Sequence, residues 1–265
     1  MGRTSAQKLH FNLKAVMKKS FAALTFASLV WIVLIQPALA GPADYVFTPT
    51  VEYGEREIDI KHGSARQPDG TLKQVTSFGV GYGAKEYWFT EVYLKQERSA
   101  GQSLSLIEWE NKFQLTETGQ YPVDFGLITE LEAPLNGNAP WEIKLGPLLQ
   151  TEFGKLQLNA NVLFKRAFGT VDESGVPFST NLGYQWQAKY RWLPVFEFGV
   201  QAMGEMGKWN DWSNQNEQNH RIGPAAFGKF ALGERQALKY NTAWLSGTSQ
   251  AAPDHTFRLQ IEYEF

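Results

Sequence analysis

The sequence predicts an all-β fold, a closed antiparallel transmembrane β-barrel of about twelve strands preceded by a cleaved signal peptide. Three observations predict it: alternation in the last segment, an export signal in residues 1–40, and turn residues that divide the remainder into segments of barrel-strand length. In the last segment one face is apolar and the other carries long polar side chains, which suits a lipid face and a wet lumen. The apolar residues are Phe257, Leu259, Ile261, Tyr263 and Phe265, and the polar ones are Thr256, Arg258, Gln260, Glu262 and Glu264.

Residues 1–40 have the features of a secretory signal peptide. They carry five basic residues and no acid, an apolar run from Phe21 to Ile35, and a small-residue cleavage site before Gly41. Cleavage after Ala40 would leave a mature chain, residues 41–265, of 225 residues. Met17, which precedes two lysines, is an alternative start. A membrane anchor is the weaker alternative, because the run is shorter than the ~20 residues that a helix needs to span.

The composition excludes several classes of protein. The chain has no cysteine, so it has no disulfide, no thiolate metal site and no lipid-bearing cysteine. All 27 acidic residues but only 20 of the 25 Lys and Arg lie after residue 40, so the mature chain has a formal charge of −7 and no basic stripe for nucleic acid. The mean hydropathy of −0.33 fits a barrel in which apolar residues occupy alternate positions.

Turn signals divide the chain after residue 44 into twelve predicted strands. Their connections alternate between short and long, so short turns would face the periplasm and long loops the outside. A change of apolar parity between Val51 and Ile58 predicts a bulge near Gly54. Pro147 and Pro224 would each remove a ladder donor. The predicted strands are 45–61, 73–83, 87–97, 104–115, 121–132, 141–152, 155–166, 179–192, 195–205, 219–231, 236–246 and 255–265.

The inward-facing residues predict a lumen with two walls of opposite charge. Such walls would orient a dipolar or charged solute in transit, although the same charges could instead pair and fill the lumen. The acidic wall comprises Glu91, Glu108, Glu110, Asp124, Glu130 and Glu142, with Glu97, Glu132 and Glu152 on the same parity. The basic wall comprises Lys165, Lys189, Arg191, Arg221, Lys229 and Lys239.

The chain end carries a family resemblance. The final Tyr263, Glu264 and Phe265 resemble the C-terminal signal of Gram-negative outer-membrane barrels, and the chain from about Asp44 onward is similar to small porin-like and uncharacterised transporter-type barrels. The resemblance implies export to the cell outer membrane, assembly by the barrel-assembly machinery, and contact with outer-membrane lipid and lipopolysaccharide. It also implies a passive channel or transporter component for a small polar or charged solute, without a cofactor.

Two other functions remain open at this stage. A non-conducting structural or surface-interaction barrel would have a plugged lumen. A lipid-modifying enzyme would need a serine beside a lipid-facing histidine, but no serine lies two residues from His220 or His255, so we expect no enzyme. Three histidines without cysteine also favour no metal site in the mature chain.

The segment 206–218 is the remaining candidate site. It contains Trp209, Asp211, Trp212 and Glu217 among several amides. Two exposed tryptophans suit either a ligand platform or an aromatic girdle at the lipopolysaccharide headgroups. If the segment folded into the lumen, Asp211 and Glu217 would gate the pore.

Overall fold

The computed structural model describes residues 41–137, 139–168 and 177–265. The chain divides into two units, Met1–Pro37 and Ala38–Phe265. All the strands belong to the second unit, whereas the predicted signal peptide, 1–40, lies outside the described residues.

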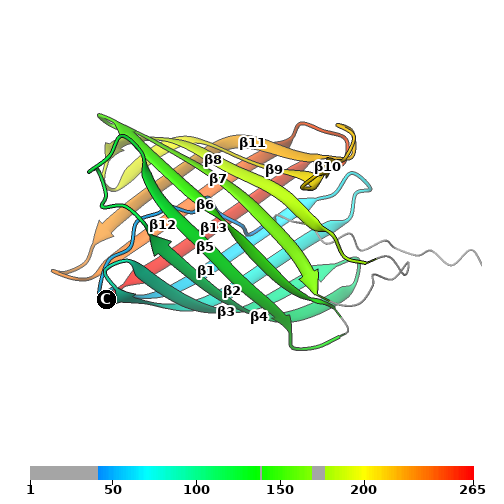
Figure 1. The fold of residues 1–265 in the computed structure, drawn as a ribbon, viewed down its shortest axis with the longest axis horizontal. Helices are drawn as coiled ribbons and strands as arrows, with labels where there is room; N and C mark the ends of the chain where they lie inside the picture. Colours follow the sequence, from blue (N-terminus) through cyan, green and yellow to red (C-terminus); the bar gives the residue numbers. More distant parts are fainter. Residues whose placement is uncertain (1–40, 138, 169–176) are drawn as a thin grey trace, which may run out of the picture. The chain divides into compact units, whose positions relative to one another are not determined.

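Twelve long antiparallel strands close into a barrel, because the last strand pairs with the first (Figure 1). The contact runs from Glu57 opposite Glu264 to Arg66 opposite His255. Because the barrel is closed, its sheet exposes no edge of unpaired backbone N–H and C=O groups to lipid. The predicted fold is confirmed. The strands are β1(Arg56–Arg66), β2(Leu72–Lys85), β3(Trp88–Ser99), β4(Gln102–Gln114), β5(Asp124–Pro134), β6(Trp141–Phe153), β7(Leu156–Phe168), β8(Thr180–Leu193), β9(Phe196–Lys208), β11(Asn219–Ala231), β12(Ala237–Gly247) and β13(His255–Glu264), with the short β10(Asp211–Trp212) beside β9.

The first predicted strand is wrong at its start. β1 begins at Arg56, and residues 41–55 belong to no strand. The parity change near Gly54 therefore marks the entry into β1, where the positive φ of 79° suits glycine, and it is not a bulge inside a strand. We call residues 41–55 the luminal segment.

The connections follow the predicted alternation in part. At what we call the short-turn end, β2–β3, β6–β7 and β8–β9 are joined by two residues each, but β4–β5 needs the nine residues 115–123. At the opposite, long-loop end, β3 and β4 are joined by Ala100 and Gly101 alone. Their φ angles of 48° and 80° are those of a tight hairpin turn that follows the twist of the strands.

Pro147 and Pro224 interrupt the hydrogen bonding between strands, as expected because proline has no backbone N–H to donate. Pro224 pairs with β9, but the register between β11 and β12 breaks off between Ile222 and Ala225. Beside Pro147, the register between β6 and β7 is interrupted in the same way. The barrel tolerates both because the neighbouring pairs continue on either side.

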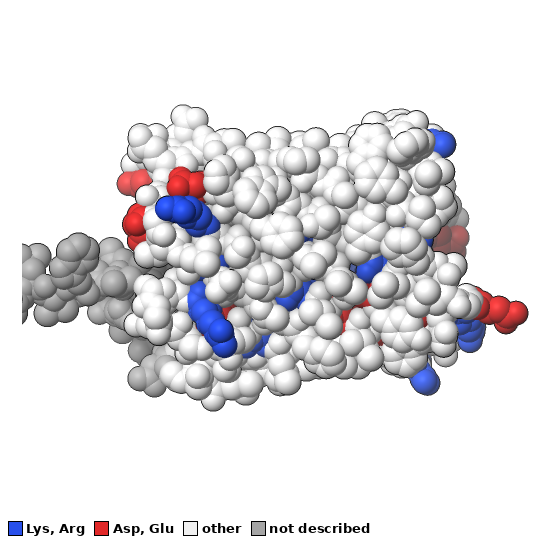
Figure 2. All heavy atoms as spheres, turned by 180° about the vertical axis from the view of Figure 1, so that it is seen from behind, with Lys and Arg blue, Asp and Glu red and all other residues white. Residues whose placement is uncertain are grey.

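The outer wall is apolar. Large apolar side chains such as Val80, Leu94, Trp109, Phe198 and Trp244 are exposed on it, which only a lipid environment would favour. Figure 2 shows a mostly uncharged face, with the most prominent charged side chains towards the two ends of the barrel. None of the described residues forms a helix long and apolar enough to span a membrane.

Candidate functional site

The luminal segment runs through the inside of the barrel and contacts opposite walls. Val46 packs in an apolar cluster with inward residues of β9, β11 and β12, whereas its neighbour Phe47 packs in a second cluster on β5, β6 and β7. Both side chains are almost fully buried, at 3% and 4% exposure. The clusters comprise Met203, Ala225, Phe227, Ala243 and Leu245 around Val46, and Ile128, Leu148 and Leu163 around Phe47.

Polar contacts hold the same stretch. Asn161 donates its amide N–H to the carbonyl oxygen of Phe47 at 3.1 Å, and the Tyr45 hydroxyl donates to Glu110 at 3.1 Å. The Lys61 ammonium lies 4.0 Å from the centre of the Tyr45 ring and 3.6 Å from that of Tyr93. Contacts made by side chains therefore hold the segment inside the lumen, and the segment is not a strand of the sheet.

Two glycines let the backbone of the luminal segment approach the wall. A Cβ on Gly63 would lie 2.1 Å from the carbonyl oxygen of Pro42, and one on Gly83 would lie 1.9 Å from that of Glu52. No larger residue could occupy either position without moving the backbone of the segment. Its path is thus fixed near both of its ends.

The luminal segment separates two cavities of different size. The larger, about 660 Å³, is lined by Tyr45, Phe47 and Thr50 of the segment and reaches the short-turn end at Lys155 and Pro194. The smaller, about 30 Å³, lies at the other side of the segment beside Gly41 and Asp44. Neighbouring residues of the segment, Asp44 and Tyr45, thus line different cavities.

The predicted acidic wall lies inside the barrel. Its carboxylates share the space with lysines: Lys95 contacts Glu108 at 2.7 Å and Glu132 at 2.5 Å, and Lys144 pairs with Glu130. Asp124 accepts a hydrogen bond from the N–H of Gly119 at 2.8 Å, beside the β4–β5 turn. Five members are below 10% exposure, namely Glu91, Glu108, Glu110, Asp124 and Glu130, while Glu142 is half-buried.

The predicted basic wall also faces the lumen, and most of its members have carboxylate partners. Two of the pairs join neighbouring strands, β6 with β7 and β8 with β9, and the other two reach over one intervening strand. The pairs are Lys165 with Glu142, Lys189 with Glu197 at 3.1 Å, Arg191 with Glu152, and Lys229 with Glu264 at 2.8 Å. Arg221 is 2% exposed and donates to Thr256 at 3.4 Å.

An uncharged strip of amide side chains separates these charges on β6 to β9. Gln157 donates to Gln150 at 2.8 Å, Gln187 donates to Asn159 at 3.3 Å, and Gln201 donates to Gln187 at 2.5 Å. Arg258 of β13 donates to Gln201 of β9, over the two intervening strands β11 and β12. Because these amides are satisfied, the strip stabilises the wall without adding charge.

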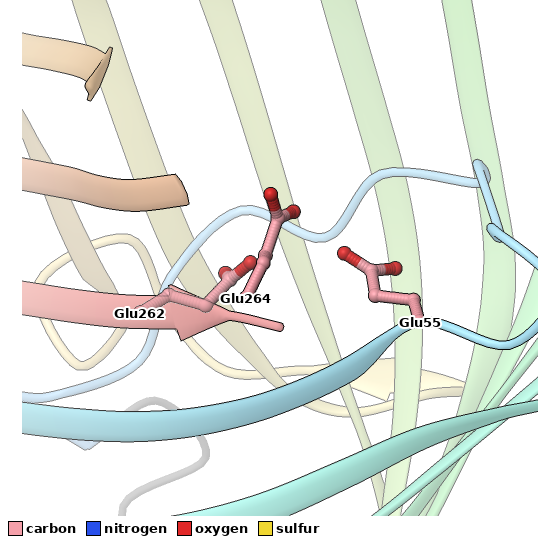
Figure 3. Close-up of side chains that lie close together, drawn as sticks. All are labelled: Glu55, Glu262 and Glu264. Carbon is pink, nitrogen blue, oxygen red and sulfur yellow. The ribbon is translucent and has the colours of Figure 1, made fainter. Parts of the chain in front are cut away.

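Three carboxylates lie close together where the first strand, β1, begins and the last strand, β13, ends. Figure 3 shows Glu55, Glu262 and Glu264 pointing toward one another, and one oxygen of each lies within 4.8 Å of the others. Lys239 lies among them, at 2.8 Å from Glu262 and 3.4 Å from Glu55, and also pairs with Glu264. The lysine supplies the positive charge that a cation would bring.

The other predicted residues lie at the ends of the barrel. Trp209 and Trp212 are 54% and 58% exposed at the long-loop end, where β10 folds back on β9. Asp211 and Glu217 are exposed there as well. At the short-turn end, the rings of Tyr263 and Phe265 stack at 5.6 Å. The loop 206–218 therefore lies outside the lumen. The luminal segment, and not this loop, lies inside the barrel.

The two candidate histidines lie on the outer wall. His220 has its ring nitrogens on the Tyr184 hydroxyl, at 3.0 Å, and on the Gln218 amide oxygen, at 2.7 Å. Ser249 bonds to the backbone N–H of His220 at 3.0 Å. The His255 ring packs against Trp244 at 5.6 Å. Neither arrangement provides the serine–imidazole hydrogen bond that acyl transfer requires.

Solved structures share the architecture. An outer-membrane channel from Pseudomonas putida F1 aligns with a TM-score of 0.56 and 14% identity, over 85% of this chain and 98% of that one. The NanC porin aligns at 0.49 and 14%, over 78% and 98%, and the outer-membrane phospholipase A of Escherichia coli at 0.39 and 10%, over 84% and 93%. No family model and no curated protein matches the sequence.

The chain has the fold of an outer-membrane β-barrel. The closed sheet, the apolar exterior and the similarity to the Pseudomonas channel agree with the location predicted from the sequence. At these identities the similarity concerns the fold, so what the outer-membrane barrel does must be argued from its lumen.

Sequence reasoning missed the luminal segment, although a signal for it exists. Ile128, Leu148 and Leu163 are apolar residues on the inward, otherwise polar parity, and so are Met203 and Leu245. Apolar side chains facing a wet lumen require an apolar partner. Such positions could have predicted that a part of the chain fills the barrel.

Proposed function

We propose that the protein is an outer-membrane channel for small polar or charged solutes, closed by its own luminal segment. One observation carries the proposal: a cavity of about 660 Å³ with charged lining residues reaches the short-turn end, and residues 45–48 of the luminal segment line it as well. This segment is outside the strand ladder, so its displacement would leave the hydrogen-bonded wall intact.

The charges of the cavity support a dipolar or charged solute. Glu57, Glu91 and Glu110 line it from β1, β3 and β4, whereas Lys189, Arg191 and Lys229 line it from β8 and β11. A solute in this cavity would experience an electric field across the lumen, because the low-dielectric walls of the barrel concentrate the field of these charges. This arrangement favours passage of a polar molecule in a fixed orientation.

The alternative is a non-conducting, structural barrel. It is favoured by the density of ion pairs and amide contacts around the segment. In that case the segment would be a permanent part of the core.

Single-channel conductance in a planar bilayer separates the two functions. We would compare the mature chain, 41–265, with a chain that begins at Glu52 and keeps every strand. The mature chain should show brief openings, and the shortened chain long-lived steps of larger conductance. A shortened barrel that folds but stays silent would exclude the channel.

The ends of the barrel have proposed partners of their own. We propose that Trp209 and Trp212 contact lipopolysaccharide headgroups and that the strand end at Tyr263 and Phe265 is bound by the barrel-assembly machinery. The proposal includes no enzymatic activity, because the His220 ring is hydrogen-bonded to Tyr184 and Gln218.

A further inference from the structure

The amino end of the luminal segment lies in the small cavity, where carboxylates outnumber ammonium groups. Six carboxylates line this cavity against three lysines. Glu97 has a further partner in Lys73, at 3.4 Å. The lining charges are Asp44, Glu97, Glu108, Glu130, Glu132 and Glu142, with Lys95, Lys144 and Lys165.

The nitrogen of Gly41 is already positioned in this cavity. It donates to Asp44 Oδ2 at 2.9 Å, and a Cβ on Gly41 would lie 3.2 Å from Asp44 Oδ1. The carboxylate of Asp44 thus folds back over the first residue of the predicted mature chain.

We propose that the α-ammonium group of Gly41, formed when the signal peptide is removed after Ala40, binds in this carboxylate cavity and latches the luminal segment in the lumen. The inference rests on the proposed gating function and on the predicted cleavage position. Signal-peptide removal would thereby create the charged group that holds the segment once the barrel has assembled.

Cleavage changes the chemistry of this one nitrogen. In the uncleaved chain it is a neutral amide with one N–H, whereas in the mature chain it is a cation with three donors near neutral pH. The acceptor, the Asp44 carboxylate, is already charged, so cleavage would turn a bond with one ionised partner into one with two and add Coulomb attraction to it. Burying a charge is tolerated when it is paired, and Asp44 lies at pairing distance.

The latch would also keep Asp44 in reach of cations on the opposite wall. Asp44 interacts electrostatically with Lys95 and Lys144 on one side and with the buried Arg221 and Arg258 on the other. Holding the amino end in place therefore holds a carboxylate between two groups of lumen cations. Release of the segment would remove this carboxylate from both.

Chemical modification of the α-amine tests the latch. The unfolded mature chain is modified at a pH where the α-amine reacts and lysines stay protonated, then refolded. Acetylation removes the charge, whereas dimethylation adds similar bulk and keeps it. We expect the acetylated barrel to show about a tenfold or larger rise in the open-to-closed ratio, and the dimethylated barrel to behave like the unmodified one. Equal behaviour of the two modified barrels would overturn the latch.

The variant Asp44→Asn supplies an independent comparison. It should open the channel to a similar extent, and acetylation of this variant should add less than about twofold, since both changes remove one interaction. Additive effects would contradict the pairing. The chain that begins at Glu52 lacks the latch and should conduct throughout, so its silence would reject the proposed channel and not the latch alone.

A labelling experiment needs no modified chain to fold. In the folded mature protein, an amine-reactive probe should label Gly41 at least about tenfold more slowly than in the folded Asp44→Asn variant, as followed by mass spectrometry. Equal rates would show that Asp44 does not hold the ammonium group and would overturn the proposal.

Discussion

At the residue scale, two neighbouring side chains anchor the luminal segment. Val46 and Phe47 point to opposite sides, as successive residues do in an extended chain, and each enters an apolar cluster on the wall it faces. Their burial anchors a segment that the sheet itself does not hold.

Phe47→Ala should release the luminal segment. Removing a buried phenylalanine costs about 3–5 kcal/mol in a protein core, so the open-to-closed ratio in single-channel recordings should rise at least about a hundredfold. Tyr53→Ala is the control, because Tyr53 lies in the same segment but is 66% exposed. An unchanged ratio for Phe47→Ala would mean that this cluster does not anchor the segment.

Lys189→Gln with Arg191→Gln should shift the channel toward cations. The substitutions leave Glu197 and Glu152 without their partners and make this side of the cavity negative. Reversal potentials in a salt gradient measure the shift. The control pair is Arg166→Gln with Lys208→Gln, whose side chains are exposed. Equal selectivity of both pairs would exclude Lys189 and Arg191 from the solute path.

At the element scale, the luminal segment and the strands are stabilised by different interactions. Each of the twelve long strands is hydrogen-bonded to two neighbours, whereas residues 41–55 rely on side-chain clusters and isolated hydrogen bonds. The segment can therefore open at a lower free energy than any strand.

A disulfide should lock the segment. Val46→Cys with Ala243→Cys places two cysteines in one buried cluster of a chain that has none. Under oxidising conditions conductance should fall below that of the reduced protein, and reductant should restore it. Each single-cysteine variant serves as control. Conduction that persists after complete cross-linking, measured by mass spectrometry, would show that solutes bypass the segment.

At the scale of the whole molecule, the barrel depends on pairing between its first and last strands. β13 lies between β1 and β12, so its residues close the sheet although they come last in the chain. Phe265 follows this strand, with its N–H on the carbonyl oxygen of Arg56 at 2.9 Å and its ring 42% exposed.

Deleting Phe265 should impair assembly more than stability. The deletion removes one backbone hydrogen bond, worth about 1 kcal/mol, and one exposed ring, so the refolded barrel should keep its β circular dichroism. In cells the amount in the outer membrane should fall several-fold if the assembly machinery binds this end. Ile60→Ala, a lipid-facing change in β1, is the control. Equal loss in both variants would contradict a specific role for Phe265.

The strands could be predicted more closely than the lumen. Alternation in β13 or β8 is a property of neighbouring residues, so the sequence shows which side of each strand is polar. The start of β1 could not be placed, because Val51 and Tyr53 alternate like a strand but belong to no strand. Ion pairs such as Lys144 with Glu130 depend on register, which alternation alone does not specify.

The sequence by itself determined a twelve-stranded barrel with a lipid-facing exterior and a charged lumen, because period-two patterning and turn residues act locally. Only the tertiary structure decided what fills that lumen. Closure of the sheet brings Met203, Leu245 and Ile128 around Val46 and Phe47, over distances in sequence that no local pattern spans. The closed barrel encloses the luminal segment beside a cavity of about 660 Å³, and its apolar inward residues select which residues of the segment they bury.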